Sequence, residues 1–488
     1  MLNKKINNKS LFILLSLVYL SLVYPISLGY KNPGNYFLTL AILLVANFSK
    51  SSKYFIFIIF LLLSFYIPVG FQFGRINYGF IISAIETDPH EAGEFLNGIL
   101  GAPLLLMLLS WIALFGYLKL PCYRMRRHYK VLCCLILVGL AINSYPKRMV
   151  KDVILYLIQS EKDLARLKKE SYIPDSFTEV ESKPKYKNII VIVGESVSAN
   201  YLSLYGYPHD NTSWMKNAPG LFMNNYVSAA SNTFMSLPRT LAVSNGVTTN
   251  VNNNIVALAN KGGYETYWIS NQGFVGEYDT PSTIIAMRAK HRIFFKKGDY
   301  NSKLVDDFTM LDTLPDILNK KENKVIFIHM IGSHPNPCER LMGYPQRFIV
   351  SDKKAINCYI ASINKLDDFV HKAYTLAKDA QQSFALTYFS DHGMTVDNSS
   401  RPVRHGNAEK QNYHVPFMII TDQSVRHQEV NTEISAYQFP NIFSELTGIS
   451  SRQITPLNVL AIPQQEVKVF DGAGMVSYDA LAKGKVIH

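Results

Sequence analysis

The chain has 488 residues, of which 48% are hydrophobic and only 18% charged, against about 25% charged residues in a typical soluble domain. This composition excludes a mainly disordered chain and a small fold held together by disulfides. The apolar residues are concentrated in residues 1–146, whereas the rest of the sequence is typical of a soluble enzyme. The sequence therefore predicts a membrane part followed by a globular part.

Five apolar segments in residues 1–146 approach the roughly 17–25 residues that a membrane-spanning helix needs. They are Leu11–Leu28, Tyr36–Phe48, Tyr54–Gly70, Asn97–Leu118 and Val131–Tyr145, and the second is short. Lysine and arginine are concentrated before the first segment, between the second and third, and between the fourth and fifth. Positively charged loops stay in the cytoplasm, so the alternation predicts an α-helical anchor of about five spans with everything after residue 146 outside. In a Gram-negative cell this means an inner-membrane anchor and a periplasmic domain.

The formal net charge is +12, from 49 basic and 37 acidic residues. Part of it belongs to the cytoplasmic loops, and part to the segment Lys147–Lys169, directly after the last predicted span. A basic segment in this place is typical of a helix that lies on anionic headgroups. We therefore assign residues 147–186 to a connector at the membrane surface, and we expect no nucleic-acid partner.

The five cysteines fall into two groups. Cys122, Cys133 and Cys134 lie at or inside the cytoplasmic face and are predicted to be free thiols. Cys338 and Cys358 lie in the exported part, where a disulfide between them is possible. No C-x-x-C pattern indicates a zinc site made of cysteines.

Five short runs rich in β-branched and aromatic residues follow in residues 187–488, separated by stretches with room for helices. This pattern predicts an α/β domain with a largely parallel sheet. Ligands of such sheets bind beyond the carboxyl ends of the strands, so the residues after each strand are the candidate site. The runs are Asn188–Val193, Glu265–Ser270, Lys324–His329, Phe384–Phe389 and Pro416–Ile420.

Carboxylates and imidazoles lie at three of these strand ends and in the polar loop that follows the fourth strand. Carboxylate and imidazole groups suit zinc. Each residue alone is more often a turn or cap residue, but their coincidence at several strand ends favours a metal site. We expect four more histidines of this domain, at positions 209, 291, 371 and 427, to be surface or packing residues. The candidate residues are Glu195, His329, His334, Asp391, His392, His405 and His414.

The segment Ser228–Thr240, which reads S-A-A-S-N-T-F-M-S-L-P-R-T, offers hydroxyl nucleophiles. A hydroxyl is weakly nucleophilic at neutral pH and needs a base or a metal to activate it. Thr233 and Ser236 are the two candidates, and composition alone does not choose between them.

The exported part resembles the phosphoethanolamine transferases of Gram-negative envelopes, which belong to the alkaline phosphatase superfamily. The matching motifs occur in the family's order across nearly the whole domain, and the five-span anchor matches as well. The motifs are N-I-I-V-I-V-G-E-S with S-L-Y-G-Y-P (188–208), N-T-F-M-S-L-P (232–238), W-I-S-N-Q (268–272), I-H-M-I-G-S-H (328–334), F-S-D-H-G (389–393) and R-H-G (404–406).

The resemblance implies a set of site residues with distinct roles. A zinc ion would be held by four residues, with Thr233 as the nucleophile. His334 and His405 fall on positions that bind the transferred phosphate or a second zinc, while His329, His414 and Asn271 are nearby substrate-binding candidates. The four residues implied as zinc ligands are Glu195, Thr233, Asp391 and His392.

The loop 71–96 contains I-I-S-A-I-E-T-D-P-H-E, which resembles the family's periplasmic loop that contacts the lipid donor. Thr87 and Glu91 fall on donor-contacting positions, and Ser83 stands where the family often has Asn. Elsewhere, Ala229 and Arg239 occupy positions at which lipid A-modifying members carry a disulfide. This departure favours a core sugar of the lipopolysaccharide as acceptor over lipid A.

The resemblance implies transfer of phosphoethanolamine from phosphatidylethanolamine to lipopolysaccharide or lipooligosaccharide, in a monomeric membrane enzyme. A sulfatase would need C/S-x-P-x-R, and Arg239 stands one place too early for that motif. A phosphoglycerol transferase of the lipoteichoic acid type would share the fold, the metal and the threonine. A hydrolase, or a membrane scaffold without catalysis, are further alternatives.

Overall fold

In a computed structural model the chain divides into two compact units, one ending at Glu161 and the other beginning at Lys162. Apart from a few single positions between residues 81 and 135, the structure describes residues 8–76, 101–123, 145–170, 173–272, 281–295, 305–399 and 401–488.

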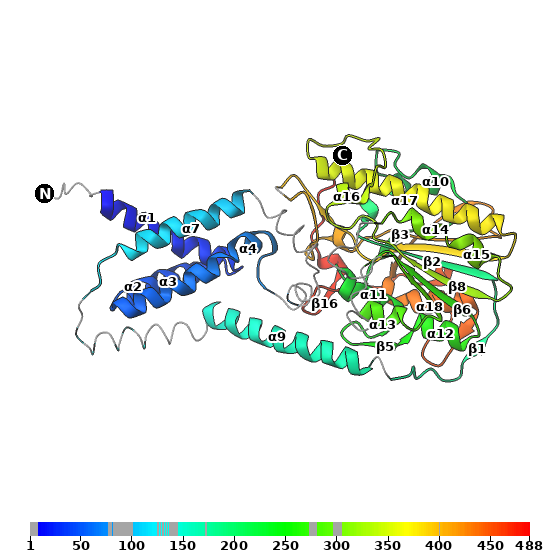
Figure 1. The fold of residues 1–488 in the computed structure, drawn as a ribbon, viewed down its shortest axis with the longest axis horizontal. Helices are drawn as coiled ribbons and strands as arrows, with labels where there is room; N and C mark the ends of the chain where they lie inside the picture. The colour runs from blue at the N-terminus through cyan, green and yellow to red at the C-terminus, as the bar shows by residue number, and fades with distance from the viewer. Residues whose placement is uncertain are drawn as a thin grey trace. The chain divides into compact units, whose positions relative to one another are not determined.

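The first unit is helical (Figure 1). Among the described residues, the helix Asn8–Ser27 is long and apolar enough to cross a membrane, and the apolar helices Pro33–Ala46 and Pro103–Leu118 are shorter. Five spans therefore remain a prediction. Most of Val131–Tyr145 and the loop positions Ser83, Thr87 and Glu91 lie outside the described residues. The helices are α1 (Asn8–Ser27), α2 (Pro33–Ala46), α3 (Lys50–Ser64), α4 (Ile67–Phe73), α7 (Ala102–Leu118) and the start of α9 (Tyr145–Glu170).

Local sequence explains several helix ends in this unit. The Asn32 side chain accepts a hydrogen bond from Gly34 N and caps α2, which begins with a proline, and Ser49 caps α3 in the same way. Lys53 on α3 is buried, and its ammonium donates to the carbonyl oxygens of Leu118 and Leu120 at 2.6 Å each. These contacts satisfy the carbonyl groups that a helix leaves unpaired at its C-terminus.

The predicted connector contains a long helix, α9, over Tyr145–Glu170. One side of it carries exposed apolar side chains, and the basic residues Lys147 and Lys151 are also exposed. Asp152 on the same helix forms an ion pair with Arg75. The location of this helix at the membrane surface stays a prediction. The exposed apolar residues are Val150, Ile154, Leu155, Leu157 and Ile158.

The second unit is built on an eight-stranded sheet with the order β13-β3-β12-β9-β2-β8-β6-β7. All neighbouring strands are parallel except β12, which is antiparallel to both β3 and β9. The sheet is thus largely parallel, as the sequence predicted. Its strands are β2 (Asn188–Gly194), β3 (Gly220–Val227), β6 (Glu265–Ser270), β7 (His291–Phe294), β8 (Lys324–His329), β9 (Phe384–Ser390), β12 (Phe417–Thr421) and β13 (His427–Ser435).

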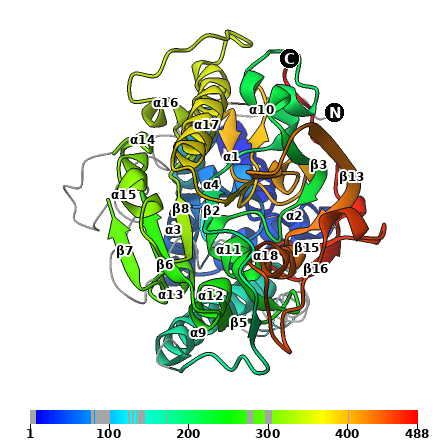
Figure 2. The ribbon, with the colours of Figure 1, turned by 90° about the vertical axis from the view of Figure 1, so that its right-hand side faces the viewer.

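Helices cover both faces of this sheet (Figures 1 and 2). Alternate residues of β2 face opposite layers: Ile189 packs with α12 (Ile255–Lys261) and α18 (Phe439–Thr447), while Ile190 packs with α17 (Lys354–Asp379). Every residue of β2, β8 and β9 is buried. Strands covered on both faces read as continuous apolar runs, which is why the sequence revealed them.

Candidate active site

The candidate site lies at the carboxyl edge of β2 and β9, the two central neighbours of the sheet. Glu195 directly follows β2, and Asp391 and His392 follow β9. All three side chains are buried, and one ligand atom from each lies within 4.8 Å of the others. His392 Nε2 is 3.2 Å from Glu195 Oε1 and 3.6 Å from Asp391 Oδ2. The register of two parallel strands therefore brings together residues that are far apart in the sequence.

A strained turn orients the two carboxylates. Ser196 has a φ of +63°, a left-handed conformation that is uncommon for residues other than glycine. In this turn Ser196 N donates to Asp391 Oδ1 at 3.1 Å, and Ser196 Oγ donates to Glu195 Oε1 at 2.6 Å. Asp391 Oδ1 also accepts from His392 N at 2.7 Å. Backbone strain that is retained at such a place is typical of functional sites.

Thr233 is the first residue of α11 (Thr233–Leu241), whose N-cap Asn232 accepts a hydrogen bond from Met235 N. The Thr233 hydroxyl donates to Glu195 Oε2 at 2.8 Å and lies 3.4 Å from His392 Nε2. A helix N-terminus favours negative charge. The helix thus delivers a hydroxyl to the carboxylates at a position that also suits a phosphate group.

The structure distinguishes the two hydroxyls that the sequence left open. Ser236 lies one turn further along α11, is fully buried, and donates its hydroxyl to the backbone oxygen of Asp391 at 2.6 Å. It therefore holds α11 against the loop that follows β9. Thr233 is partly exposed and is the hydroxyl that contacts Glu195 and His392.

Two further histidines, His334 and His405, lie next to this group. The His405 ring centroid is 5.0 Å from that of His392 and 6.1 Å from that of His334. His405 Nδ1 is buried without a hydrogen-bond partner. His334 Nδ1 lies 3.5 Å from Nη2 of Arg340, a buried arginine. The ring of His405 thus neighbours those of both His392 and His334.

The electrostatics of this group depend on two carboxylates in one buried place. Burial and the negative charge of Glu195 raise the pKa of Asp391 to about 8. Burial by itself would also raise the pKa of Glu195, but His392 outweighs it and holds that pKa well below its ordinary value. Burial would lower the pKa of His392, whereas Asp391 and Glu195 raise it to about 9. Burial and the charge of His392 lower the pKa of His405 well below its ordinary value.

These residues fit a metal ion. Asp391 Oδ2 is buried and has no hydrogen-bond partner, although buried polar atoms are almost always paired. A cation would satisfy this oxygen and relieve the repulsion that raises the pKa of Asp391. Two carboxylates, an imidazole and a hydroxyl form a donor set that suits zinc.

Two of the predicted substrate-binding residues, Asn271 and His414, have partners elsewhere in the fold. The Asn271 amide donates to Val305 O and to Asp307 Oδ1 at 2.7 and 2.8 Å. His414 contacts Asn200 Oδ1 and Asn224 O with its two ring nitrogens. Both side chains therefore hold the fold, and their substrate-binding role stays a prediction.

His329 is buried, with its ring against Trp268 and Nδ1 3.3 Å from Ser270 Oγ. Its Nε2 has no hydrogen-bond partner. Burial lowers the pKa of His329 to about 4, so the imidazole is neutral at physiological pH. We treat it as a residue of the core beside the site.

Gln272 is a site residue that the sequence reasoning missed. Its Nε2 donates to Glu195 Oε2 at 2.9 Å and to Met330 O at 2.8 Å. The signal was present, because Gln272 lies two residues after the end of β6 and closes the motif W-I-S-N-Q. The other histidines expected to pack do so: His209, His291, His371 and His427 each lie against an aromatic ring.

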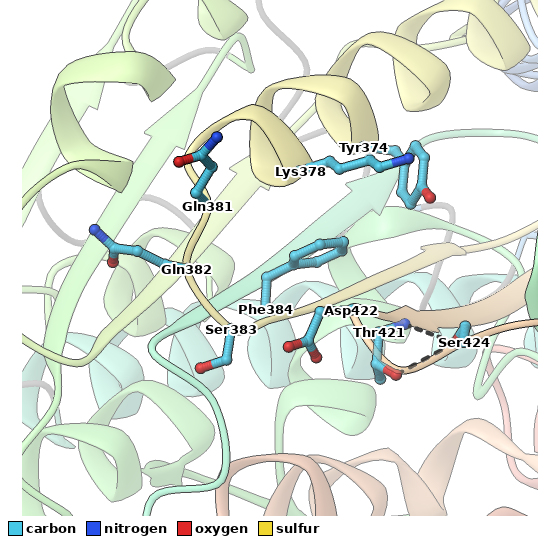
Figure 3. A pocket seen from close by; sticks show the side chains of 9 residues that line it. All are labelled: Tyr374, Lys378, Gln381, Gln382, Ser383, Phe384, Thr421, Asp422 and Ser424. Atoms are coloured by element: carbon cyan, nitrogen blue, oxygen red, sulfur yellow. Dashed lines mark hydrogen bonds between the residues drawn. The ribbon is translucent and has the colours of Figure 1, made fainter.

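A separate pocket of about 280 Å³ is found elsewhere in the domain (Figure 3). It is lined by Phe384, the first residue of β9, by Thr421, the last residue of β12, and by the end of α17. The amino end of β9 lies opposite the edge that carries Asp391. This pocket is therefore not part of the candidate active site.

The sequence is similar to a known family and to curated proteins. A family model described as Sulfatase matches residues 187–449. The phosphoethanolamine transferase OpgE of Escherichia coli K12 is 34% identical over 319 residues, which are 64% of this chain and 60% of OpgE. The chain thus matches less than two thirds of the length of OpgE. A putative phosphoethanolamine transferase of Haemophilus influenzae is 30% identical over 358 residues, 70% of this chain and 74% of that protein.

Two solved structures share the fold. The integral membrane protein lipooligosaccharide phosphoethanolamine transferase A (EptA) from Neisseria meningitidis has a TM-score of 0.60 at 18% identity, covering 91% of this chain and 96% of its own. The C-terminal periplasmic domain of EptC from Escherichia coli, in complex with zinc, has a TM-score of 0.54 at 20% identity, covering 63% of this chain and 97% of its own. At these identities the similarity shows the fold alone.

Proposed function

We propose that this chain, which belongs to the sulfatase family and is an enzyme of the phosphoethanolamine transferase type, transfers phosphoethanolamine from phosphatidylethanolamine to lipopolysaccharide or lipooligosaccharide. The observation that carries the proposal is the hydrogen bond from the Thr233 hydroxyl to Glu195 inside a buried group of metal-binding side chains. A nucleophile held in this way suits covalent group transfer. The family name does not imply sulfate chemistry, because Arg239 breaks the C/S-x-P-x-R motif.

Glu195, Thr233, Asp391 and His392 would hold a zinc ion, which when bound lowers the pKa of a hydroxyl and neutralises phosphate charge. The zinc complex of the EptC domain supports this choice of metal. The histidine pair His334 and His405 offers donors for a second ion, and counting the ions requires metal analysis of the purified protein.

The first step forms a bond between Thr233 Oγ1 and the phosphorus of the donor. The bond from phosphorus to the glycerol oxygen breaks, and diacylglycerol leaves with a proton. Glu195 accepts the hydrogen bond of the Thr233 hydroxyl and is ionised, because His392 holds its pKa low. The N-terminus of α11 stabilises the negative charge that develops on the phosphoryl oxygens.

The second step transfers the group to the acceptor. A sugar hydroxyl or a phosphate of the acceptor attacks the phosphorus of phosphoethanolamine-Thr233, and the bond to Thr233 Oγ1 breaks. His405 lies beside His392, and His334 lies beside His405, where an imidazole N–H donates to a phosphoryl oxygen or passes a proton. The low pKa of His405 keeps its ring neutral, so one of its nitrogens always remains available as an acceptor.

A membrane anchor suits this reaction, because the donor and the proposed acceptor are both membrane lipids. We propose an inner-membrane protein with its catalytic domain in the periplasm, and a monomer as the working unit. The described helix Asn8–Ser27, which is able to span a membrane, and the exposed apolar side of α9 support this location.

The test is the intact mass of the detergent-purified, zinc-loaded chain after incubation with phosphatidylethanolamine and no acceptor. We expect a phosphoethanolamine-sized adduct on the wild type, release of diacylglycerol, and neither with Thr233→Ala. A folded, zinc-loaded chain that gives no adduct contradicts the proposed donor. An adduct with phosphatidylglycerol in its place would move the chain to the phosphoglycerol transferases.

The acceptor is tested by chase. The adduct is formed with labelled donor and then mixed with purified lipopolysaccharide or, as a matched control, with a neutral glucan that carries no lipid. We expect the label to move to lipopolysaccharide. Mild acid hydrolysis of the product then separates the core sugars from lipid A and shows which part carries the label. Label that moves to the glucan and not to lipopolysaccharide would contradict the proposed acceptor.

A further inference from the structure

A buried carboxylate outside the metal-binding group joins two of the loops that build the site. Asp307 is 5% exposed. Its Oδ1 accepts hydrogen bonds from Asn271 Nδ2 at 2.8 Å and from Ile331 N at 3.0 Å, and its Oδ2 accepts from Gly332 N at 2.9 Å. Asn271 follows β6, and Ile331 and Gly332 follow the neighbouring strand β8. One side chain therefore connects two strand ends.

The second of these loops lies directly on the backbone of Glu195. Gly332 has a φ of +49°, and a Cβ atom on it would lie 2.9 Å from Glu195 O, so any larger residue would force the two segments apart. Ser333 N donates to Glu195 O at 3.0 Å. The same loop continues to His334. Asp307 thus holds the turn that fixes the main chain of Glu195.

The loop after β6 holds the side chain of Glu195. Gln272, next to Asn271 in the sequence, donates to Glu195 Oε2 and to Met330 O. The carboxylate of Glu195 is therefore held by the loop after β6, and its backbone oxygen by the loop after β8. Asp307 is bonded to both loops at once, whereas its own hydrogen bonds go to neither the nucleophile nor the metal-binding side chains.

We propose that Asp307 is a positioning residue that sets the orientation of the Glu195 carboxylate through Gln272 and the 331–333 turn. Without the Asp307 carboxylate, three N–H donors in a buried place lose their acceptor, and the two loops lose their common link. Glu195 then shifts relative to Thr233 and His392. The inference about metal affinity stands by itself, and the inference about the transfer rate rests on the proposed function.

The test compares Asp307→Asn with Asp312→Asn in the full-length chain in detergent. Asn keeps the shape of Asp307 but turns one acceptor into a donor that faces N–H groups. Asp312 lies five residues further on and is exposed, so it is a matched control. Zinc affinity is measured by competition with a chromogenic chelator. We expect a loss on the order of tenfold for Asp307→Asn, the lower range for residues that orient metal ligands, and no change for Asp312→Asn.

A double-mutant cycle of Asp307 and Gln272 separates positioning of Glu195 from a general effect on folding. In a Gln272→Leu background, Asp307→Asn should lower zinc affinity by less than about threefold, because one of the two links is already absent. Equal losses in both backgrounds, or an affinity for Asp307→Asn within about twofold of the wild type, would overturn the proposal. If Asp307→Asn does not fold by circular dichroism, Asn271→Ala removes one of the three hydrogen bonds and should give an intermediate loss.

Diacylglycerol release from phosphatidylethanolamine is measured on the same samples. We expect kcat to fall by a factor similar to the loss of zinc affinity while KM for the donor stays within about twofold, since the buried Asp307 carboxylate is bonded to the two loops. A wild type that binds zinc but releases no diacylglycerol would contradict the proposed function, and the role of Asp307 would still be decided by the zinc titrations.

Discussion

The Thr233 hydroxyl donates a hydrogen bond to Glu195 Oε2 over 2.8 Å, although the two residues are 38 positions apart in the sequence. The contact joins the start of a helix to the end of the central strand β2. It makes Thr233 the hydroxyl with a base beside it, whereas the hydroxyl of Ser236 is used in a bond to the backbone of Asp391.

This contact predicts different effects at the two hydroxyls. Thr233→Ala should abolish both the adduct and donor turnover, by at least about a thousandfold, and Thr233→Ser should retain part of the turnover. Ser236→Ala should keep the adduct and lose about 1 kcal/mol of stability, because it removes one buried hydrogen bond. Intact mass and thermal unfolding of the three variants check this. An adduct that persists in Thr233→Ala and disappears in Ser236→Ala would reverse the assignment.

Zinc affinity should depend on pH because zinc competes with protons at Asp391 and His392. Burial and the charge of Glu195 raise the pKa of Asp391 to about 8, and against the effect of burial the two carboxylates raise the pKa of His392 to about 9, so both groups must lose a proton to bind zinc near pH 7. We expect affinity to rise by about tenfold per pH unit for each proton released as the pH increases toward 8.

The released protons can be counted directly. Calorimetry in buffers of different ionisation enthalpy gives the number released at pH 6.5, and Asp391→Asn should release about one proton fewer than the wild type. A proton release that is the same in both proteins would show that Asp391 is already ionised in the metal-free chain.

The sequence revealed the parts of the fold that are buried on both faces. The five predicted strands were found, because each is a continuous apolar or aromatic run. The sheet members β3, β7 and β13 were not predicted. The β13 segment H-Q-E-V-N-T-E-I-S is polar and lies at the edge of the sheet, where one side of a strand needs no partner.

Part of the candidate site could also be predicted from the sequence, and the gap at Asp307 has a physical reason. Glu195, Asp391 and His392 were found because they follow parallel strands. Gln272 also follows a parallel strand and could have been found in this way, whereas Asp307 follows none of the predicted strands and acts through hydrogen bonds to two other loops. The family resemblance also gave Asn271 and His414 a substrate-binding role, which stays a prediction, because a motif position does not show where a side chain points.

The disulfide between Cys338 and Cys358 should stabilise the catalytic domain. It joins α16 (Pro337–Arg340) to α17 across a separation of 20 residues, and closing a loop of this length contributes about 3 kcal/mol. Replacing both cysteines by serine should lower the melting temperature by several degrees. Arg340 on α16 contacts His334, so we also expect a lower kcat. Cys122→Ser is the control, and an unchanged melting temperature in the double variant would refute a stabilising role.

The predicted topology places Cys122 in the cytoplasm and the catalytic domain outside. Cys122 is exposed and free. In a chain with Cys133 and Cys134 replaced by serine, a membrane-impermeant maleimide should label Cys122 only after spheroplasts are permeabilised. Val425, which is 91% exposed, supplies the control, because Val425→Cys should be labelled in intact spheroplasts. Labelling of Cys122 from outside would contradict the predicted orientation.

His329 should make the stability of the metal-free chain depend on pH in a defined direction. Burial lowers its pKa from 6.5 to about 4, so between these values the unfolded chain binds a proton that the folded chain does not. The contribution of His329 to the free energy of unfolding is therefore fully present above pH 6.5. It is lost as the pH falls toward 4, by up to about 1.4 kcal/mol per pH unit. His329→Gln should remove this slope.

Asp391 has a raised pKa and contributes the opposite slope, because the folded chain binds its proton more tightly than the unfolded chain. The informative quantity is therefore the difference in melting temperature between wild type and His329→Gln, measured with a chelator at pH 7.0, 6.0 and 5.0. We expect the wild type to lose stability relative to the variant at each step down. A difference that stays constant over the three pH values would show that His329 is protonated in the folded chain as readily as in the unfolded one.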